Sequence, residues 1–240
     1  GQREANAMTN QTAVVVGVGP GLGLALVKAF ANEGYTVFAA AREASALEEL
    51  SALRGKRVIP VDIDATNSAQ VDELFAGAEK KAPVAVTIFN AGTFVRTTVV
   101  DTDPEVFERC WRVGCFGGFL VGRAAARLMT KRGAGTILFT GATAALRGGA
   151  GFVNLASPKF ALRAVAQSMA RELGLQGIHV AHVIIDGQIH AARYADLLSE
   201  RGADSLLEPD AIAQTYVALH RQHRSAWTQE LDLRPWTERF

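Results

Sequence analysis

The chain has 240 residues, a size at which one domain with a well-buried core is expected. Hydrophobic residues make up 49% and charged residues 20%, and no apolar run approaches the roughly 18 residues that cross a bilayer. The net charge of +1 comes without a block of Lys and Arg, which argues against a nucleic-acid or membrane partner. Cys110 and Cys115 lie five residues apart in a helical pattern, so we expect no disulfide between them. A reducing cytoplasm is the expected location, because the N-terminus shows no apolar signal segment.

Residues 1–7 (GQREANA) show neither helical nor strand periodicity, and we expect a tag remnant or a disordered arm there. Downstream, short apolar runs rich in β-branched residues alternate with longer stretches of 3.6-residue periodicity. This alternation predicts that residues 8–240 form a single Rossmann-like α/β domain, with one doubly wound parallel sheet of about seven strands and helices on both faces. The strands are expected at Ala13–Val16, Thr36–Ala40, Arg57–Val61, Val84–Phe89, Thr136–Phe139, Val180–Ile185 and Glu230–Leu233.

Three apolar stripes predict core helices between these strands, over residues 22–30, 106–128 and 162–173. The segment Gln188–Leu207 is the one long stretch without clear periodicity. We expect it to form a lid on the substrate side.

A glycine-rich loop, Gly17-Val18-Gly19-Pro20-Gly21-Leu22-Gly23, stands between the first strand and the first helix. Glycines there let the backbone approach a pyrophosphate, and the helix N-terminus attracts its negative charge. A tight turn alone would also use glycine, but four glycines in seven residues at this place favour a dinucleotide-binding function.

The second strand ends without the Asp or Glu that usually binds the ribose 2′-hydroxyl of NAD. Arg42 stands there instead, and its planar guanidinium could pair with a 2′-phosphate. The sequence therefore favours NADP(H) over NAD(H), the alternative being a solvated arginine beside Glu43.

This pattern resembles the short-chain dehydrogenase/reductase family, whose loop reads T-G-x-x-x-G-x-G and here has Val16 for the leading Thr. The resemblance continues with Asp62-Ile63, matching the residue that meets the adenine, with Asn90-Ala91-Gly92, and with Asp186-Gly187 in place of the usual Pro-Gly. It covers almost all of residues 12–240. The cofactor-binding residues that it implies are Gly17, Gly19, Gly21, Leu22, Gly23, Arg42, Asp62, Ile63, Asn90, Ala91, Gly92, Lys159, Gly187 and Ile189.

The family's catalysis uses a Tyr as acid and base, a Lys four residues later, a Ser and a helix Asn. Lys159 is present, but Leu155 occupies the Tyr position, Ala142 the Ser position and Gly114 the Asn position. A slip of one residue would bring Thr143 to the Ser position. The remaining catalytic candidates are therefore Lys159 and Thr143. The three tyrosines lie elsewhere, at positions 35, 194 and 216.

Two functions fit this pattern. The first is an NADP(H)-dependent oxidoreductase that acts on a small, fairly apolar carbonyl or alcohol with a non-standard proton donor. The candidate donors are Thr143, Thr140, His190, Tyr194 and an ordered water. The second is a catalytically inactive NADP(H)-binding sensor or scaffold protein.

No metal is implied, since His179 and His182 should point to opposite faces of a strand. The resemblance further implies a homodimer or homotetramer, paired through helices at about residues 104–129 and 155–174.

Overall fold

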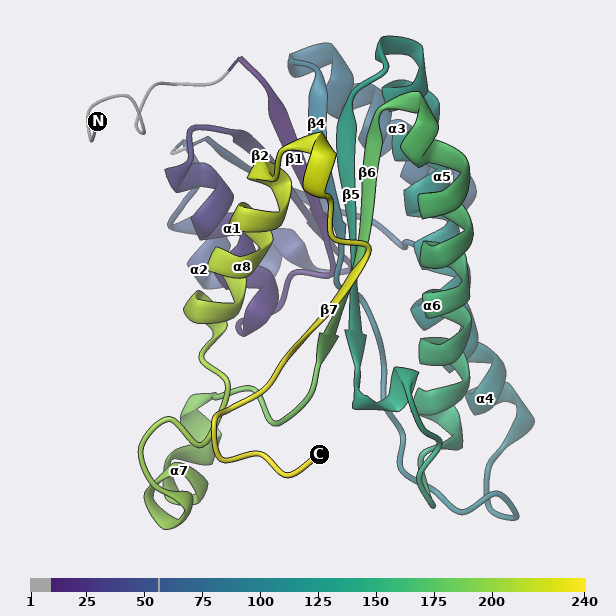
Figure 1. Cartoon of the computed structure of the whole chain (residues 1–240), viewed down its shortest axis with the longest axis vertical. Coiled ribbons are helices and arrows are strands. Elements are labelled where there is room, and N and C mark those ends of the chain that lie inside the picture. Colours follow the sequence, from purple (N-terminus) through teal and green to yellow (C-terminus); the bar gives the residue numbers. More distant parts are fainter. Residues whose placement is uncertain (1–9, 56) are drawn as a thin grey trace.

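The computed structural model describes residues 10–55 and 57–240, which form one seven-stranded, fully parallel sheet in the order β3-β2-β1-β4-β5-β6-β7 (Figure 1). The predicted doubly wound α/β fold is confirmed, and each strand lies where it was expected, with small shifts at the ends. Their bounds are β1 (Thr12–Val16), β2 (Thr36–Ala41), β3 (Val58–Asp62), β4 (Val84–Phe89), β5 (Gly135–Ala142), β6 (Ile178–Ile185) and β7 (Glu230–Leu233).

Helices cover both faces of the sheet. One face carries α1 (Leu22–Asn32), α2 (Glu48–Ser51) and α8 (Pro209–Arg221), and the other carries α3 (Ser68–Lys81), α4 (Pro104–Trp111), α5 (Gly117–Arg132) and α6 (Val153–Leu173) (Figure 1). Within the described ranges, no helix is both long and apolar enough to cross a membrane.

Strand β1 shows why these strands are apolar throughout. Ala13 and Val15 pack in the core under α1 and α8, whereas Val14 and Val16 pack in the core under α3, α5 and α6. Because side chains alternate between the two faces of a strand, both faces of a central strand must be apolar when helices cover both. The unbroken apolar runs in the sequence follow from this double burial.

The helix expected over residues 104–129 is interrupted in the structure. Between α4 and α5 the chain widens into a π-helical turn, Arg112–Phe116. Glycines at this place let α6 approach closely: a Cβ on Gly114 would lie 3.0 Å from Pro158, and one on Gly118 would lie 2.5 Å from Leu162. The apolar periodicity persists through the turn, so it could not reveal the interruption.

The segment Gln188–Leu207 is also more regular than predicted. It contains α7 (Ala195–Arg201), and its two ends are joined by a bridge between Ile189 and Leu207. A helix of seven residues is too short to establish a clear period, so the sequence pattern missed it. In Figure 1, α7 lies beyond the carboxyl ends of the strands, beside the C-terminal segment.

Candidate functional site

Three adjoining cavities lie along the carboxyl ends of the strands, where parallel α/β sheets bind their ligands. The largest, of about 920 Å³, extends from the glycine loop to the segment after β6. A second, of about 430 Å³, lies toward β2 and β3 and shares the wall formed by Gly17, Gly19, Asn90, Gly92 and Thr93. A third, of about 390 Å³, lies under the loop that follows β5. After the roles that the family resemblance implies for their linings, we call these the central, adenine-side and substrate-side cavities.

The glycines of the loop have two different roles. Gly17 has a φ of +98°, and a Cβ there would lie 2.4 Å from the backbone nitrogen of Ala91. Gly23 is equally enclosed, since its Cβ would lie 2.5 Å from the carbonyl oxygen of Gly17. A Cβ on Gly19 or Gly21, in contrast, would meet nothing within 4 Å, and both residues line the central cavity. Gly17 and Gly23 are therefore needed for packing, whereas Gly19 and Gly21 leave open space.

That open space suits a phosphate group. Among the described residues no side chain caps the start of α1. The backbone N–H of Leu24 donates to the carbonyl oxygen of Gly19 at 3.1 Å, which leaves those of Leu22 and Gly23 next to the open glycines. The loop is held in place from β4, because Asn90 donates from Nδ2 to the carbonyl oxygen of Gly17 at 3.1 Å. Ala91 and Gly92 continue this wall.

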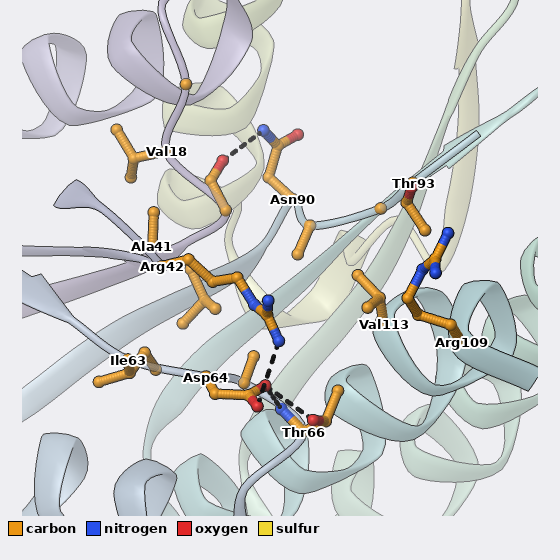
Figure 2. Close-up of a pocket in the computed structure, with 16 residues that line it drawn as sticks. Val18, Ala41, Arg42, Ile63, Asp64, Thr66, Asn90, Thr93, Arg109 and Val113 are labelled. Carbon is orange, nitrogen blue, oxygen red and sulfur yellow. Dashed lines mark hydrogen bonds and ion pairs between the residues drawn. The ribbon is translucent and has the colours of Figure 1, made fainter. Parts of the chain in front are cut away.

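The adenine-side cavity is crossed by Arg42, which reaches from the end of β2 to Asp64 (Figure 2). The two side chains form an ion pair at 3.4 Å. Hydrogen bonds from Thr66 and the charge of Arg42 keep the pKa of Asp64 below its ordinary value. Arg109 of α4 and Thr93 line the same cavity on the side away from Asp64 (Figure 2).

The Asp62 side chain is hydrogen-bonded to Ser45. Its carboxylate accepts hydrogen bonds from the backbone N and the Oγ of Ser45, at 2.8 and 2.6 Å. Ile63 and Asp64 line the adenine-side cavity in its place. Sequence reasoning missed Asp64 and Arg109. The sequence shows a second acidic residue two positions after Asp62, but no pattern marks it as the one that lines a cavity.

Lys159 of α6 lines the central cavity. Its Nζ donates to the carbonyl oxygen of Thr140 at 3.1 Å and lies near Gly92. Burial lowers the pKa of Lys159 to about 8. At neutral pH its ammonium therefore gives up a proton more readily than that of an exposed lysine, and a larger fraction of the side chain is the neutral amine.

Apolar side chains stand where the family resemblance places a tyrosine and a serine. Leu155 and Ala142 both line the central and the substrate-side cavities, and they form part of the wall between them. Gly114, at the position implied for the helix asparagine, packs against Pro158. Gly187 and Ile189 follow β6 and line the central cavity.

The candidate proton donors have separate environments. The Thr140 hydroxyl is buried and bonded to the Tyr216 hydroxyl at 2.6 Å, so it is engaged inside the core. His190 lines the central cavity and bonds through Nδ1 to Glu208 at 2.9 Å. Tyr194 lies under the guanidinium of Arg193.

Thr143 lines the substrate-side cavity and donates to Asp186 at 2.6 Å.

The cavities are continuous along the sheet edge. Gly19, Gly21 and Lys159 line the central cavity, and Arg42 lines the adenine-side cavity, which shares its wall. Residues 11–191 match the family model described as short chain dehydrogenase. The chain belongs to the short-chain dehydrogenase family. It is therefore an oxidoreductase-family protein with the family's nicotinamide-dinucleotide cleft.

Solved and characterised members of the short-chain dehydrogenase family resemble the chain along most of its length. A crystal structure of a short-chain dehydrogenase from Rhodopseudomonas palustris has 42% identity and a TM-score of 0.83, and the match covers 95% of this chain and 100% of that one. The 3-oxoacyl-[acyl-carrier-protein] reductase MabA of Mycobacterium avium is 28% identical over 86% of this chain and 75% of its own length. The (+)-borneol dehydrogenase 1 of Salvia officinalis is 29% identical over 71% of this chain and 67% of its own.

Proposed function

We propose that the protein is an NADP(H)-dependent oxidoreductase that interconverts a small, fairly apolar carbonyl compound and its alcohol. The observation that carries this proposal is the position of Lys159. A partly buried lysine whose pKa lies near 8 lines the central cavity, which adjoins the apolar substrate-side cavity. A general acid works best when its pKa lies near the working pH.

The cofactor would be held by the backbone at Gly19 and Gly21 and by the start of α1 on its pyrophosphate, with Lys159 at the nicotinamide end. Arg42 would bind the 2′-phosphate, exchanging its weak and exposed contact with Asp64 for a bidentate one. When bound, NADPH supplies the hydride that reduces the carbonyl carbon.

Lys159 would provide the proton. In reduction its ammonium protonates the substrate oxygen, and in oxidation its neutral amine takes the hydroxyl proton. Leu155 supplies no phenol between the two cavities, so Lys159, which lines the central cavity, would act on the substrate oxygen directly or through a water. Thr143 would contact the substrate from the wall of the substrate-side cavity.

The substrate-side cavity favours an apolar molecule. Its lining is mostly carbon, and the polar groups at its edge are few. The residues that form it are Ala142, Thr143, Ala144, Arg147, Gly149, Phe152, Leu155, Ile185, Gly187 and Gln188. The name of one relative, (+)-borneol dehydrogenase 1, supports an alcohol as one of the two reactants.

The first test combines titration calorimetry with NADPH and NADH and a panel of aldehydes and ketones. The reduction rate should fall as the pH rises through about 8, because the Lys159 ammonium then loses the proton that it donates. Replacing Lys159 with Met should lower turnover by about 100-fold or more and remove this pH dependence. Lys28→Met, on the exposed side of α1, is the matched control and should change neither. A pH profile that Lys159→Met leaves unchanged would contradict the proposed role.

The NADP(H) preference has its own test. Arg42→Ala should weaken NADPH binding by about 10- to 100-fold and leave NADH binding within about twofold, since only NADPH carries the 2′-phosphate. Calorimetry on both nucleotides measures the two effects. An equal loss for both nucleotides would show that Arg42 does not select the cofactor.

Leu155 and Ala142 also favour the second function, an inactive NADP(H) sensor or scaffold. Neither side chain can move a proton, and both face the place where the chemistry would occur. NADPH binding without turnover on any substrate would support this alternative. Absence of binding by either nucleotide would contradict both functions.

A further inference from the structure

Thr143 lines the substrate-side cavity, and its hydroxyl is bonded to a buried carboxylate. Its Oγ1 donates to Oδ1 of Asp186 at 2.6 Å. A hydroxyl has one proton, and a carboxylate can only accept. The Thr143 oxygen therefore keeps acceptor lone pairs for a ligand while its proton is already in use.

The carboxylate of Asp186 is held in its ionised form. Its side chain is buried, and Oδ2 accepts from Nε of Arg234 at 3.1 Å. Burial alone would raise the pKa of Asp186, but the hydrogen bonds from Thr143 and Arg234 and the charges of Arg234 and Arg147 together lower it. A protonated Asp186 that could return a proton to Thr143 is thus disfavoured.

Packing from the C-terminal segment fixes this carboxylate. The backbone nitrogen of Asp186 donates to the carbonyl oxygen of Leu233 at 2.8 Å. At Gly187 a Cβ would lie only 2.9 Å from Pro235, so the two segments are in close contact. Arg234 is itself held by Asp232 at 2.5 Å. The contacts of Asp186 with β7 and the segment after it keep its side chain directed at Thr143.

We infer that the substrate-side cavity recognises an alcohol hydroxyl through Thr143 and disfavours a carbonyl oxygen at the same place. An alcohol hydroxyl can donate a hydrogen bond to the Thr143 oxygen. A carbonyl oxygen has no proton to donate, so its lone pairs would be repelled by those of the Thr143 oxygen. This inference rests on the proposed function, which assigns the cavity to the substrate. A net hydrogen-bond contribution of about 1 kcal/mol corresponds to roughly a fivefold difference in affinity.

The other two polar side chains among the described residues of this cavity, Gln188 and Arg147, form no hydrogen bond with Asp186. The Gln188 amide donates to the carbonyl oxygen of Ile189 at 3.2 Å, and Arg147 lies exposed at the rim. The hydroxyl of Thr143 is thus the polar group that the Asp186 network fixes in place.

The test compares ligands that share a carbon skeleton: cyclohexanol with cyclohexanone, and 1-phenylethanol with acetophenone. Dissociation constants are measured by NMR titration of the nucleotide-free protein, where no turnover can occur. The wild-type protein should bind each alcohol about fivefold more tightly than its ketone. Equal affinities, tighter binding of the ketones, or no binding of either ligand would overturn the inference.

Variants test whether the hydrogen bonds among Thr143, Asp186 and Arg234 cause the preference for alcohols. Thr143→Val should equalise alcohol and ketone, and Thr143→Ser should keep the preference. Asp186→Asn should reverse the preference, so that ketones bind more tightly than alcohols. Because Arg234 can only donate hydrogen bonds, the new amide would direct its carbonyl oxygen to Arg234 and its NH₂ to Thr143. Thr143 would then accept from the amide and direct its own proton into the cavity. Asp232→Asn, which alters the other partner of Arg234, is the control and should keep the preference. A preference that survives in Thr143→Val would contradict the assignment.

Failure of this inference differs from failure of the proposed function. If NADPH binds and carbonyl compounds turn over while alcohols and ketones bind equally, only the inference is wrong. If neither nucleotide binds while the alcohol preference and its reversal in Asp186→Asn are observed, the proposed function is wrong and the hydroxyl site stands.

Discussion

Replacing Ala142 with Ser and Leu155 with Tyr together should raise the rate of carbonyl reduction by about 10²- to 10⁴-fold. Both native side chains face the cleft, where the larger polar groups have room. Lys159 follows Leu155 by one helical turn on α6, so a phenol at position 155 would lie on the same helix face as the ammonium. The ammonium would lower the pKa of the phenol and prepare it to donate a proton.

The measurement is NADPH oxidation with a panel of small ketones, under single-turnover conditions. Ala142→Ser combined with Leu155→Phe is the matched control: it adds the aromatic ring and the serine but no phenolic proton. A comparable gain in this control would mean that the ring improves substrate packing and that proton transfer was never limiting. No gain in either variant would favour the sensor or scaffold function.

The fold could be predicted because its signals are local. Each buried strand is an apolar run that a turn signal ends, and helices on both faces of the sheet force that pattern. The parts that were missed have no such signal. The π-helical turn at Arg112–Phe116 depends on how closely α6 approaches, and α7 is too short to show a period.

The candidate site also has a part that the sequence could predict and a part that it could not. Lys159, Leu155 and Ala142 could be assigned to one cleft because they belong to a pattern with fixed spacing, and the structure places all three on the central cavity. Thr143 and Asp186 meet across 43 residues, and Asp186 meets Arg234 across another 48. These partners follow three adjacent strands, β5, β6 and β7, so only the register of the sheet brings them together.

A bulky side chain at Gly19 should abolish nucleotide binding and leave the fold intact. Gly19→Leu is expected to weaken NADPH binding by about 100-fold or more, since its side chain would fill the space kept open for the phosphates. Its melting temperature should stay within about 2 °C of the wild-type value, because a Cβ there meets no protein atom within 4 Å.

Gly17→Ala should instead destabilise the fold. The φ of +98° and the clash with the backbone of Ala91 should cost about 3 kcal/mol, or roughly 6–12 °C in melting temperature. Gly77→Ala in α3, where a Cβ also meets nothing within 4 Å, is the control and should bind NADPH normally. Calorimetry and thermal unfolding on the three variants separate glycines that the fold requires from those that a ligand requires. Normal NADPH binding by Gly19→Leu would mean that the open space beside α1 is not a phosphate site, and the nucleotide-dependent functions would lose their structural basis.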